Sequence, residues 1–309
     1  MPGRLKPTLI FIVGPTAAGK TRLSIKLAKR LKGEIISVDS MQVYKGMNIT
    51  SQAVTGRKQL GVRHHLVGEL DPSKEYNVNV FREKSEEIIA SILKRGKVPI
   101  IVGGSGLYVK ALIDGLFPSP EADMVFRGRM LEYAKKYGSS KLHKKLAKID
   151  PNSAASIHPN DTRRIIRALE LYDSTGKTMT ELKLETKGLG NRFRIRMFGL
   201  NMPREKLYEA INNRVEQMFK DGLTREVKRL SEKKLSKTAR MALGYKEVLG
   251  FIEGEYGADE AKEMLKMNTR RFAKRQMAWF RAWGKRVTWF DPEKISDVRI
   301  VEMIKRKAF

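Results

Sequence analysis

The chain has 309 residues, with 62 Lys and Arg against 34 Asp and Glu, and its net charge of +28 at pH 7 favours a polyanionic partner such as nucleic acid. The absence of cysteine excludes disulfides, thiolate zinc sites and cysteine nucleophiles. We see no signal peptide and no apolar run long enough to cross a membrane, so we expect a cytoplasmic protein without membrane attachment.

The first hundred residues alternate between predicted strands and predicted helices. Short apolar runs predict buried strands at 9–13, 34–38 and 98–102. Leucines at helical spacing predict a helix after the first strand, and a second apolar periodicity, which ends at Gly96, predicts one before the third. Strands that are apolar throughout and alternate with helices predict a parallel sheet covered on both faces.

The character of the sequence changes after residue 120. Residues 121–190 contain many helix formers and basic residues but little strand signal, which predicts a helical insertion. The later predicted elements are a returning strand, two long helices and a last strand, at 192–197, 204–234, 258–285 and 287–290. We therefore expect a core formed by 1–120 and 191–309, with 121–190 inserted between its two parts.

A G-x-x-x-x-G-K-T motif comes directly after the first predicted strand, and it consists of Gly14, Pro15, Thr16, Ala17, Ala18, Gly19, Lys20 and Thr21. A strand before it and a helix after it are the context of a phosphate-binding loop. The glycines let backbone N–H groups turn toward phosphate oxygens, and the helix offers its positive N-terminal end. Lys20 adds a cation, and the Thr21 hydroxyl can ligate Mg²⁺. The motif predicts binding of a di- or triphosphate and an α/β fold like that of the P-loop NTPases, a parallel sheet flanked by helices, here with an all-helical insertion domain.

Two polar positions follow the other predicted strands and therefore belong at the same sheet edge as the phosphate loop. Asp39 is an aspartate near Mg²⁺, a general base, or a turn cap together with Ser40, and spacing does not separate these roles. Ser105 lies in the glycine-rich stretch 103–108, where its hydroxyl can donate to a phosphate or accept from a substrate amine.

Later basic residues are candidates for contacts with a nucleic-acid backbone. One face of the helix predicted at 258–285 is either solvated or in contact with phosphates, and it carries Arg270, Lys274, Arg281 and Lys285. Another face of that helix is aromatic and typical of a hydrophobic core, with Phe272, Trp279 and Trp283. Arg163 and Arg167 lie one turn apart after a predicted cap at Asn160–Asp161.

Motifs along the whole chain occur in the order of one family. The chain resembles the tRNA dimethylallyltransferases over nearly its full length, and the ordered set of motifs makes this resemblance specific. Besides the phosphate loop, the matching stretches are 37–47, 64–66, 71–72, 81–82, 103–108, 158–161, 163–170, 244–245 and 274–276.

This resemblance implies transfer of a dimethylallyl group from dimethylallyl diphosphate to the exocyclic N6 amine of the adenosine 3′ to a tRNA anticodon. It implies that the phosphate loop binds the diphosphate, with Mg²⁺ at Thr21, and that Asp39 and Ser105 are catalytic, Asp39 as the general base. The insertion is expected to grip the anticodon stem-loop, in a protein that acts as a monomer. The residues implied in tRNA binding are Asp39, Ser40, Met41, Gln42, Ser105, Arg127, Arg163, Arg164, Ile165, Ile166, Arg167, Gly244, Tyr245, Lys274, Arg275 and Gln276.

The chain departs from the family pattern at two places. Ser105 stands where many members have threonine, which retains the hydroxyl with less rotational restraint. The stretch 50–55 replaces a usual Gly-Thr-Ala-Lys-Pro sequence, so its contacts are not inherited from the resemblance.

Three alternatives remain open from the residues alone. They are an adenylate isopentenyltransferase that acts on a free nucleotide, a small-molecule kinase that uses the same loop, and an RNA-binding protein with a vestigial nucleotide site. The basic insertion favours tRNA over a free nucleotide. The presence of Lys20, Thr21, Asp39 and Ser105 argues against the vestigial site.

Overall fold

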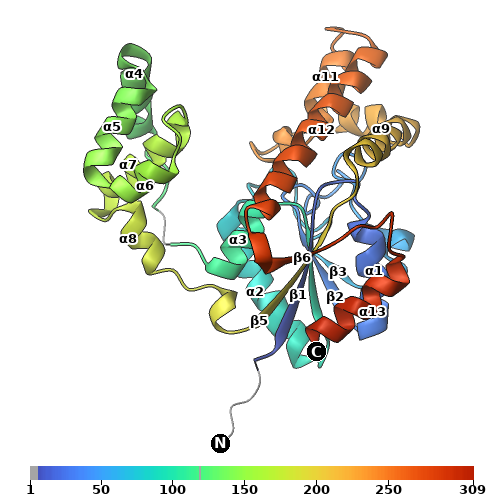
Figure 1. The fold of residues 1–309 in the computed structure, drawn as a ribbon. Helices are drawn as coiled ribbons and strands as arrows, with labels where there is room; N and C mark the ends of the chain where they lie inside the picture. The colour runs from blue at the N-terminus through green and yellow to red at the C-terminus, as the bar shows by residue number, and fades with distance from the viewer. Residues whose placement is uncertain (1–5, 118–119) are drawn as a thin grey trace, which may run out of the picture. The chain divides into compact units, whose positions relative to one another are not determined.

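The computed structural model describes residues 6–117 and 120–309. The chain divides by its contacts into two units, Met1–Ile113 with Arg192–Phe309, and Asp114–Asn191 (Figure 1). The predicted insertion, 121–190, falls inside the second of these units. Within the described part of the chain, no helix is both long and apolar enough to span a membrane.

The first unit contains a six-stranded sheet in which every pair of neighbours is parallel, as predicted. Its strands are β1 (Thr8–Val13), β2 (Glu34–Val38), β3 (His64–His65), β4 (Pro99–Gly103), β5 (Arg194–Leu200) and β6 (Val287–Phe290). They lie in the order β3-β2-β4-β1-β5-β6, so the chain runs outward from β1 to β2 and then returns to place β4 between them. The carboxyl ends of all six strands share one edge of the sheet.

Some helices of the first unit lie on the two faces of this sheet, and others extend beyond one end of its strands (Figure 1). Together these helices are α1 (Lys20–Leu31), α2 (Val78–Lys94), α3 (Gly106–Asp114), α9 (Arg204–Lys220), α10 (Leu223–Ser231), α11 (Tyr245–Ile252), α12 (Ala258–Arg281) and α13 (Asp297–Ala308). The first unit also contains the short 3₁₀ turns η1 (Gly56–Gln59), η3 (Ala239–Met241) and η4 (Gly284–Arg286). A further 3₁₀ turn, η2 (Leu189–Asn191), belongs to the second unit. Because right-handed crossovers that run in opposite directions along a sheet emerge on opposite faces, α1 and α2 lie on different sides.

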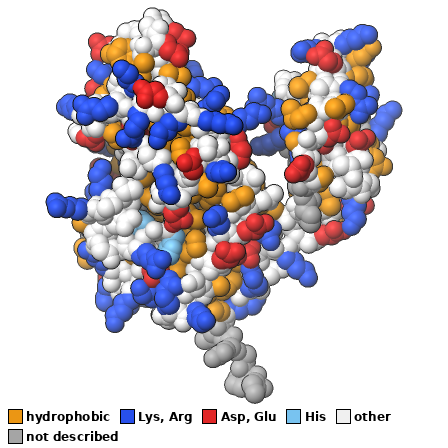
Figure 2. Space-filling view, turned by 180° about the vertical axis from the view of Figure 1, so that it is seen from behind, with side chains coloured by type: hydrophobic (Ala, Val, Ile, Leu, Met, Phe, Trp, Pro, Cys, Tyr) orange, Lys and Arg blue, Asp and Glu red, His pale blue; other side chains and the backbone are white. Residues whose placement is uncertain are grey.

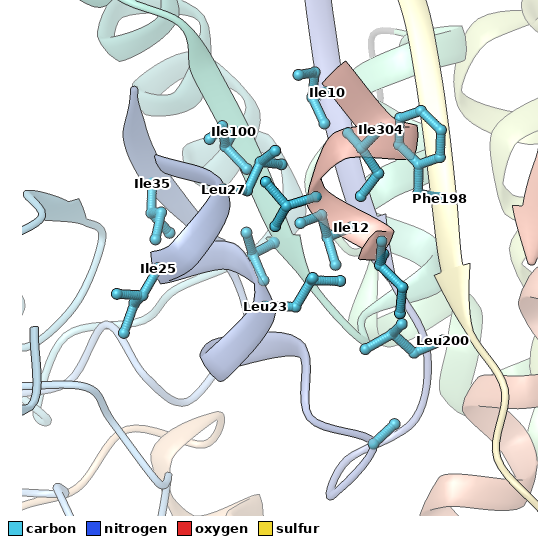
Figure 3. Packing of buried hydrophobic residues seen from close by; sticks show 14 of the residues in the cluster. Ile10, Ile12, Leu23, Ile25, Leu27, Ile35, Ile100, Phe198, Leu200 and Ile304 are labelled. Carbon is cyan, nitrogen blue, oxygen red and sulfur yellow. The ribbon is translucent and has the colours of Figure 1, made fainter. Parts of the chain in front are cut away.

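Mainly aliphatic side chains from the strands, α1 and α13, with a few from α9 and α12, form the core on one face of the sheet (Figure 3). The residues fully shielded from water include Ile10, Ile12, Leu27, Ile100, Ile300 and Ile304. Burying each such side chain contributes about 1.5–3 kcal/mol, so this cluster fixes α1, and with it the preceding loop, against the sheet.

Two predictions about helices differ from the structure. The single helix predicted at 204–234 is broken into α9 and α10, because Gly222 adopts a left-handed conformation with φ +98° and starts a new helix. Helix α13, capped by the Ser296 side chain, was not predicted, although its buried residues Ile300, Val301 and Ile304 recur at helical spacing.

The second unit is a small helical bundle. It contains α4 (Met124–Tyr137), α5 (Ser139–Ile149), α6 (Pro151–Ser156), α7 (Thr162–Thr175) and α8 (Met179–Leu184), and no strand occurs among its described residues. Its own core includes Phe126, Leu142, Leu146, Ile165 and Leu169. The predicted cap is confirmed, because the Asp161 side chain accepts from the Arg164 N–H at 3.2 Å.

Candidate active site

Three neighbouring strands bring their carboxyl ends together. Gly103 of β4 is paired with Val13 of β1 on one side and with Val38 of β2 on the other. The residues that follow these strand ends, which begin the phosphate loop and include Asp39, therefore lie next to one another. The approach is close, since a Cβ on Gly103 would come within 2.1 Å of the Val38 carbonyl oxygen.

The loop at 14–21 has the strand–loop–helix arrangement that the motif predicts. Gly14 has φ +138°, and a Cβ there would lie 2.8 Å from the Leu200 carbonyl oxygen. Gly19 is left-handed and forms the N-cap of α1, so the helix starts at Lys20. The loop therefore leads into the positive end of α1, an arrangement that suits an anion.

Two cations lie at this loop. The Lys20 Nζ donates to the Pro15 carbonyl at 2.6 Å, and Arg214 donates to the Thr16 Oγ1 at 3.0 Å. Removal from water lowers the pKa of Lys20 from 10.5 to about 7, with a further contribution from repulsion by Arg214, whereas Asp39 opposes the shift. Burial also lowers the pKa of Arg214. The negative charge of an incoming diphosphate would stabilise the charged forms of both side chains.

Asp39 lies at the end of β2 and keeps a carboxylate directed to the same site. Its Oδ1 accepts the Met41 N–H at 2.8 Å, which is the turn contact considered from the sequence. Removal from water raises its pKa, and the Met41 N–H and the charge of Lys20 oppose that rise. A carboxylate held in a poorly hydrated site beside cations can both accept a proton and remain ionised at neutral pH.

A hollow of about 250 Å³ lies beside Ser105. It is lined by Gly104, Ser105, Gly106, Leu107, Tyr108, Phe272, Arg275, Gln276 and Trp279. The prediction that the aromatic face of α12 belongs to the core is wrong, because Phe272, Trp279 and Trp283 are only half-buried. Periodicity shows which face of a helix is apolar but not what covers it. Trp279 packs closely against Gly106, where a Cβ would lie 2.8 Å from the tryptophan side chain. All three aromatic side chains remain partly exposed.

The comparisons with known proteins agree with this geometry. A model of the family described as IPP transferase matches residues 42–283, and one described as isopentenyl transferase matches residues 7–69. A tRNA dimethylallyltransferase of Carboxydothermus hydrogenoformans is 48% identical over 302 residues, 97% of each chain. This chain belongs to the tRNA dimethylallyltransferase family. The family member of Bacillus subtilis is 45% identical over 307 residues, 98% of this chain and 96% of its own.

Solved structures of the family have the same fold. The tRNA isopentenylpyrophosphate transferase of Bacillus halodurans superimposes with a TM-score of 0.72 at 42% identity, covering 98% of this chain and 96% of its own. A eukaryotic dimethylallyltransferase described as acting on tRNA gives a TM-score of 0.75 at 29% identity, covering 96% of this chain and 77% of its own.

Family motif residues that follow Asp39 contact the neighbouring turn at 49–53. Gln42 accepts from the Ser37 hydroxyl at 2.8 Å, and its Nε2 donates to the carbonyls of Ser51 and Gln52 at 3.4 and 3.3 Å. Ser40 and Met41 are half-buried beside it. The side chain of Gln42 therefore supports the turn at 49–53 from inside.

The divergent stretch 50–55 is anchored by Glu226 of α10, a residue that the sequence did not single out. Its carboxylate accepts from the N–H groups of Ile49 and Thr50, at 2.9 and 2.8 Å, and from the Thr50 hydroxyl at 2.6 Å. The Thr50 hydroxyl therefore adds a contact with Glu226 that a glycine at this position would lack.

Residues of the C-terminal motifs divide between structure and surface. Gly244 has φ +94° and starts α11, and its N–H donates to Glu247 at 2.9 Å, while Tyr245 is buried. On α12, Lys274 and Arg275 are exposed. Of the predicted basic face, Arg270 is half-buried, because it donates to Asn212 at 2.8 Å and lies over the Tyr208 ring.

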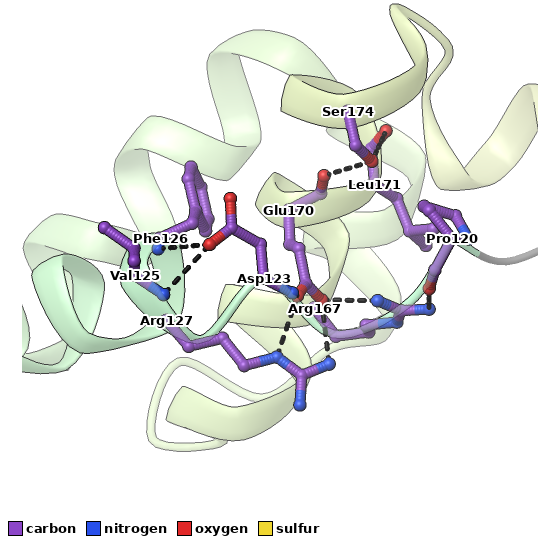
Figure 4. A network of polar contacts seen from close by, with 9 residues as sticks. All are labelled: Pro120, Asp123, Val125, Phe126, Arg127, Arg167, Glu170, Leu171 and Ser174. Atoms are coloured by element: carbon purple, nitrogen blue, oxygen red, sulfur yellow. Dashed lines mark hydrogen bonds and ion pairs between the residues drawn. The ribbon is translucent and has the colours of Figure 1, made fainter.

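In the second unit, the family arginines have two different environments. Arg127 and Arg167 both pair with Glu170, whose side chain is 1% exposed (Figure 4). Arg163 and Arg164 are exposed. Ile165 and Ile166, implied in tRNA binding, are buried in the helical core, so their side chains pack within the unit and do not face RNA.

Lys and Arg side chains are spread over the face shown in Figure 2.

Glu170 joins α7 to the start of α4 in the second unit. Burial opposes its charge, but hydrogen bonds from Arg127 and Arg167 hold its pKa below the usual range, and it also accepts from the Asp123 N–H at 2.8 Å. We expect Glu170→Gln to destabilise this unit by about 2 kcal/mol, because two guanidinium groups lose their carboxylate partner. Urea unfolding followed by far-UV circular dichroism measures the loss.

The tryptophans supply an internal control for this variant, since Trp279, Trp283 and Trp289 all belong to the first unit. Their fluorescence transition is expected to stay at the wild-type urea concentration. A fluorescence shift as large as the dichroism shift would contradict a role confined to the helical unit. The exposed Arg163→Gln is the matched variant without effect on either signal.

Proposed function

We propose that this chain transfers the dimethylallyl group of dimethylallyl diphosphate to the N6 amine of the adenosine 3′ to the anticodon of tRNA and releases diphosphate. The observation that carries the proposal is one sheet edge at which the end of β2, followed by Asp39, lies close to the end of β1, which leads into the phosphate loop with Lys20. Membership of the family, all of whose cited relatives are named for this activity, supports it. Because tRNA is the acceptor, we place the reaction in the cytoplasm and expect a monomer to perform it.

The donor side of the site fits a diphosphate bound with Mg²⁺. The loop amides, Lys20 and Arg214 would bind the phosphate oxygens. Among the described residues there is no cluster of three or more His, Asp or Glu suited to a metal, and Thr21 is exposed at the end of the loop. Mg²⁺ retains several waters and binds substrate phosphates, so the Thr21 hydroxyl with the diphosphate fits this ion. When bound, it would neutralise charge that develops on the departing diphosphate.

The chemistry follows from these positions. The bond between the allylic carbon and the diphosphate oxygen breaks as the N6 nitrogen of adenine forms the new C–N bond. Asp39 accepts the proton that N6 loses, and Lys20 and Arg214 stabilise the negative charge that accumulates on the leaving group. The Ser105 hydroxyl lies on the acceptor side, at the hollow described above. The adenine must leave its stack to reach this site, at a cost of a few kcal/mol.

The decisive experiment is mass spectrometry of nucleosides from unmodified tRNA after incubation with the protein, dimethylallyl diphosphate and Mg²⁺. We expect N6-dimethylallyl adenosine in tRNA. Parallel reactions with adenosine monophosphate as the acceptor test the adenylate isopentenyltransferase alternative, and reactions with ATP and tRNA test the kinase alternative. Prenylated free nucleotide, or ADP formed from ATP, without product in tRNA would overturn the proposal.

The depressed pKa of Lys20 makes donor binding depend on pH. A bound diphosphate favours the ammonium and raises the pKa above about 7, its value in the protein alone. At a pH between the pKa of Lys20 in the free protein and its higher pKa in the complex, binding takes up a proton. The affinity for pyrophosphate therefore falls as the pH rises above 7, by up to about tenfold per pH unit. Calorimetry at pH 8 in buffers of different ionisation enthalpy counts the protons. Lys20→Met retains the titration of pyrophosphate itself, and equal uptake by both proteins would contradict the prediction.

Binding of tRNA is expected to depend steeply on salt, because the net charge of +28 acts on phosphates. With about six phosphate contacts, affinity falls about 10³-fold between 50 and 200 mM salt. Exposed Arg163 is a candidate contact, and Arg163→Gln is expected to reduce the slope of log K against log salt by about one. Filter binding over a salt series measures the slope, and a flat response would contradict the role of charge.

A further inference from the structure

Gln276 is a buried polar side chain that touches two loops of the site at once. Only 5% of it is exposed, whereas its neighbours Lys274 and Arg275 on α12 are exposed. Its Oε1 accepts the Thr16 N–H at 2.8 Å. A buried carboxamide keeps such a partner because an unpaired polar atom costs about 1–3 kcal/mol.

The other end of the carboxamide lies against the turn that carries Ser105. A Cβ on Gly104 would meet the Gln276 Nε2 at 2.1 Å and the Gly14 carbonyl oxygen at 3.1 Å. No side chain other than hydrogen fits at position 104 with the carboxamide in this place. Gln276 is therefore wedged between the phosphate loop and the Gly104–Ser105 turn.

The Thr16 N–H is also a candidate donor to a substrate phosphate. In a loop of this kind, backbone N–H groups bind phosphate oxygens, so a diphosphate oxygen and the Gln276 Oε1 compete for one donor. Arg214 donates to the Thr16 hydroxyl at 3.0 Å, and this contact opposes a rotation that would turn the Thr16 N–H away from both acceptors. The carboxamide is planar, and a shift of Oε1 away from Thr16 moves Nε2 at Gly104 as well.

We propose that Gln276 is a positioning residue that couples the two substrates. Binding of the donor diphosphate displaces Oε1 from Thr16. The carboxamide then moves as a whole, and Nε2 shifts Gly104 and Ser105 on the acceptor side. The coupling is reciprocal, so the acceptor strengthens donor binding by the same factor. The inference rests on the proposed function for the identity of the acceptor, while the competition at Thr16 concerns any diphosphate.

Calorimetric titration of the full chain with inorganic pyrophosphate and Mg²⁺ tests the competition. Gln276→Leu removes the competitor, and we expect it to bind pyrophosphate about threefold to tenfold more tightly. Gln276→Glu keeps an acceptor for Thr16 and adds negative charge, so it is expected to bind more weakly. Shifts in opposite directions separate the proposal from a structural role, which would weaken binding in both variants.

Gln217→Leu is the matched control, because Gln217 is exposed on α9 and its Nε2 donates to Asp221 at 2.7 Å. It is expected to bind pyrophosphate as the wild type does. A thermal unfolding scan confirms that each variant is folded, and if Gln276→Leu is not, Gln276→Met, which also lacks an acceptor for the Thr16 N–H, takes its place and is likewise expected to bind pyrophosphate more tightly. Unchanged affinity in Gln276→Glu would overturn the competition.

A second titration, with an unmodified anticodon stem-loop RNA present, tests the coupling. The RNA is expected to tighten pyrophosphate binding by about fivefold or more in the wild type and by a factor of about one in Gln276→Leu. Equal coupling in the two proteins would overturn the proposal. If the wild type fails to prenylate tRNA while the opposite pyrophosphate shifts persist, the proposed function fails and the competition at Thr16 stands.

Discussion

Asp39→Asn is expected to lower kcat by about a hundredfold or more, with less than a tenfold change in the affinity for tRNA or pyrophosphate. Asparagine retains an oxygen that can accept the Met41 N–H, so the turn after β2 is preserved. It cannot take the proton that N6 loses. Single-turnover assays with saturating donor and tRNA measure the chemical step without product release.

The chain contains a matched control for this substitution. Asp291 follows β6 as Asp39 follows β2, and its Oδ1 accepts the Glu293 N–H at 3.0 Å in the same kind of turn. Asp291→Asn therefore makes the same chemical change at another strand end and is expected to leave kcat unchanged. If Asp39→Asn retained more than a tenth of wild-type turnover, Asp39 would be a turn residue and the base would lie elsewhere.

Lys20→Met and Arg214→Met are expected to lower kcat by about 10²–10³-fold each, because each removes a cation that stabilises the departing diphosphate. The two losses are expected to be less than additive, since the cations repel one another and share one substrate group. Quenched-flow measurement of diphosphate release checks both variants and the double variant. Lys29→Met changes an exposed lysine at the far end of α1 and serves as the control.

For Arg214 the outcome also separates binding from chemistry. A loss confined to KM would show that Arg214 binds substrate and transition state equally. A loss of kcat with little change in KM would place its contribution in the transition state. Unchanged kinetics would contradict the assignment of Arg214 to the donor site.

The sequence predicted the parallel sheet well because β1, β2 and β4 are buried along nearly their whole length. The runs at 34–38 and 287–290 are strands with the predicted bounds. The phosphate loop was also predictable, since its glycines, lysine and threonine occupy fixed places between strand and helix. Asp39 was placed at the correct sheet edge, but its role depends on neighbours that a sequence does not show.

The residues that sequence reasoning missed belong to helices that are distant in the chain. Arg214 lies in the middle of α9 with no motif around it, and only the packing of the fold brings it to Thr16. Glu226 acts on 49–50 from α10 in the same way. Arg127 and Arg167 carried a signal of charge, yet Glu170 on the same unit takes up both guanidinium groups. Composition counts such charges without showing their partners.

The position of β1 has a consequence for how the polypeptide reaches its native state. β1 is paired with β4 and with β5, and the whole helical unit Asp114–Asn191 separates these two partners in the chain. During synthesis, after β4 has been made, one edge of β1 stays without its neighbour until about ninety more residues have been added. A helical unit that folds by itself shortens the distance that this connection must close, which lowers the entropic cost of adding β5. Variants that unfold this unit are therefore expected to slow maturation of the sheet and to expose β1 to aggregation.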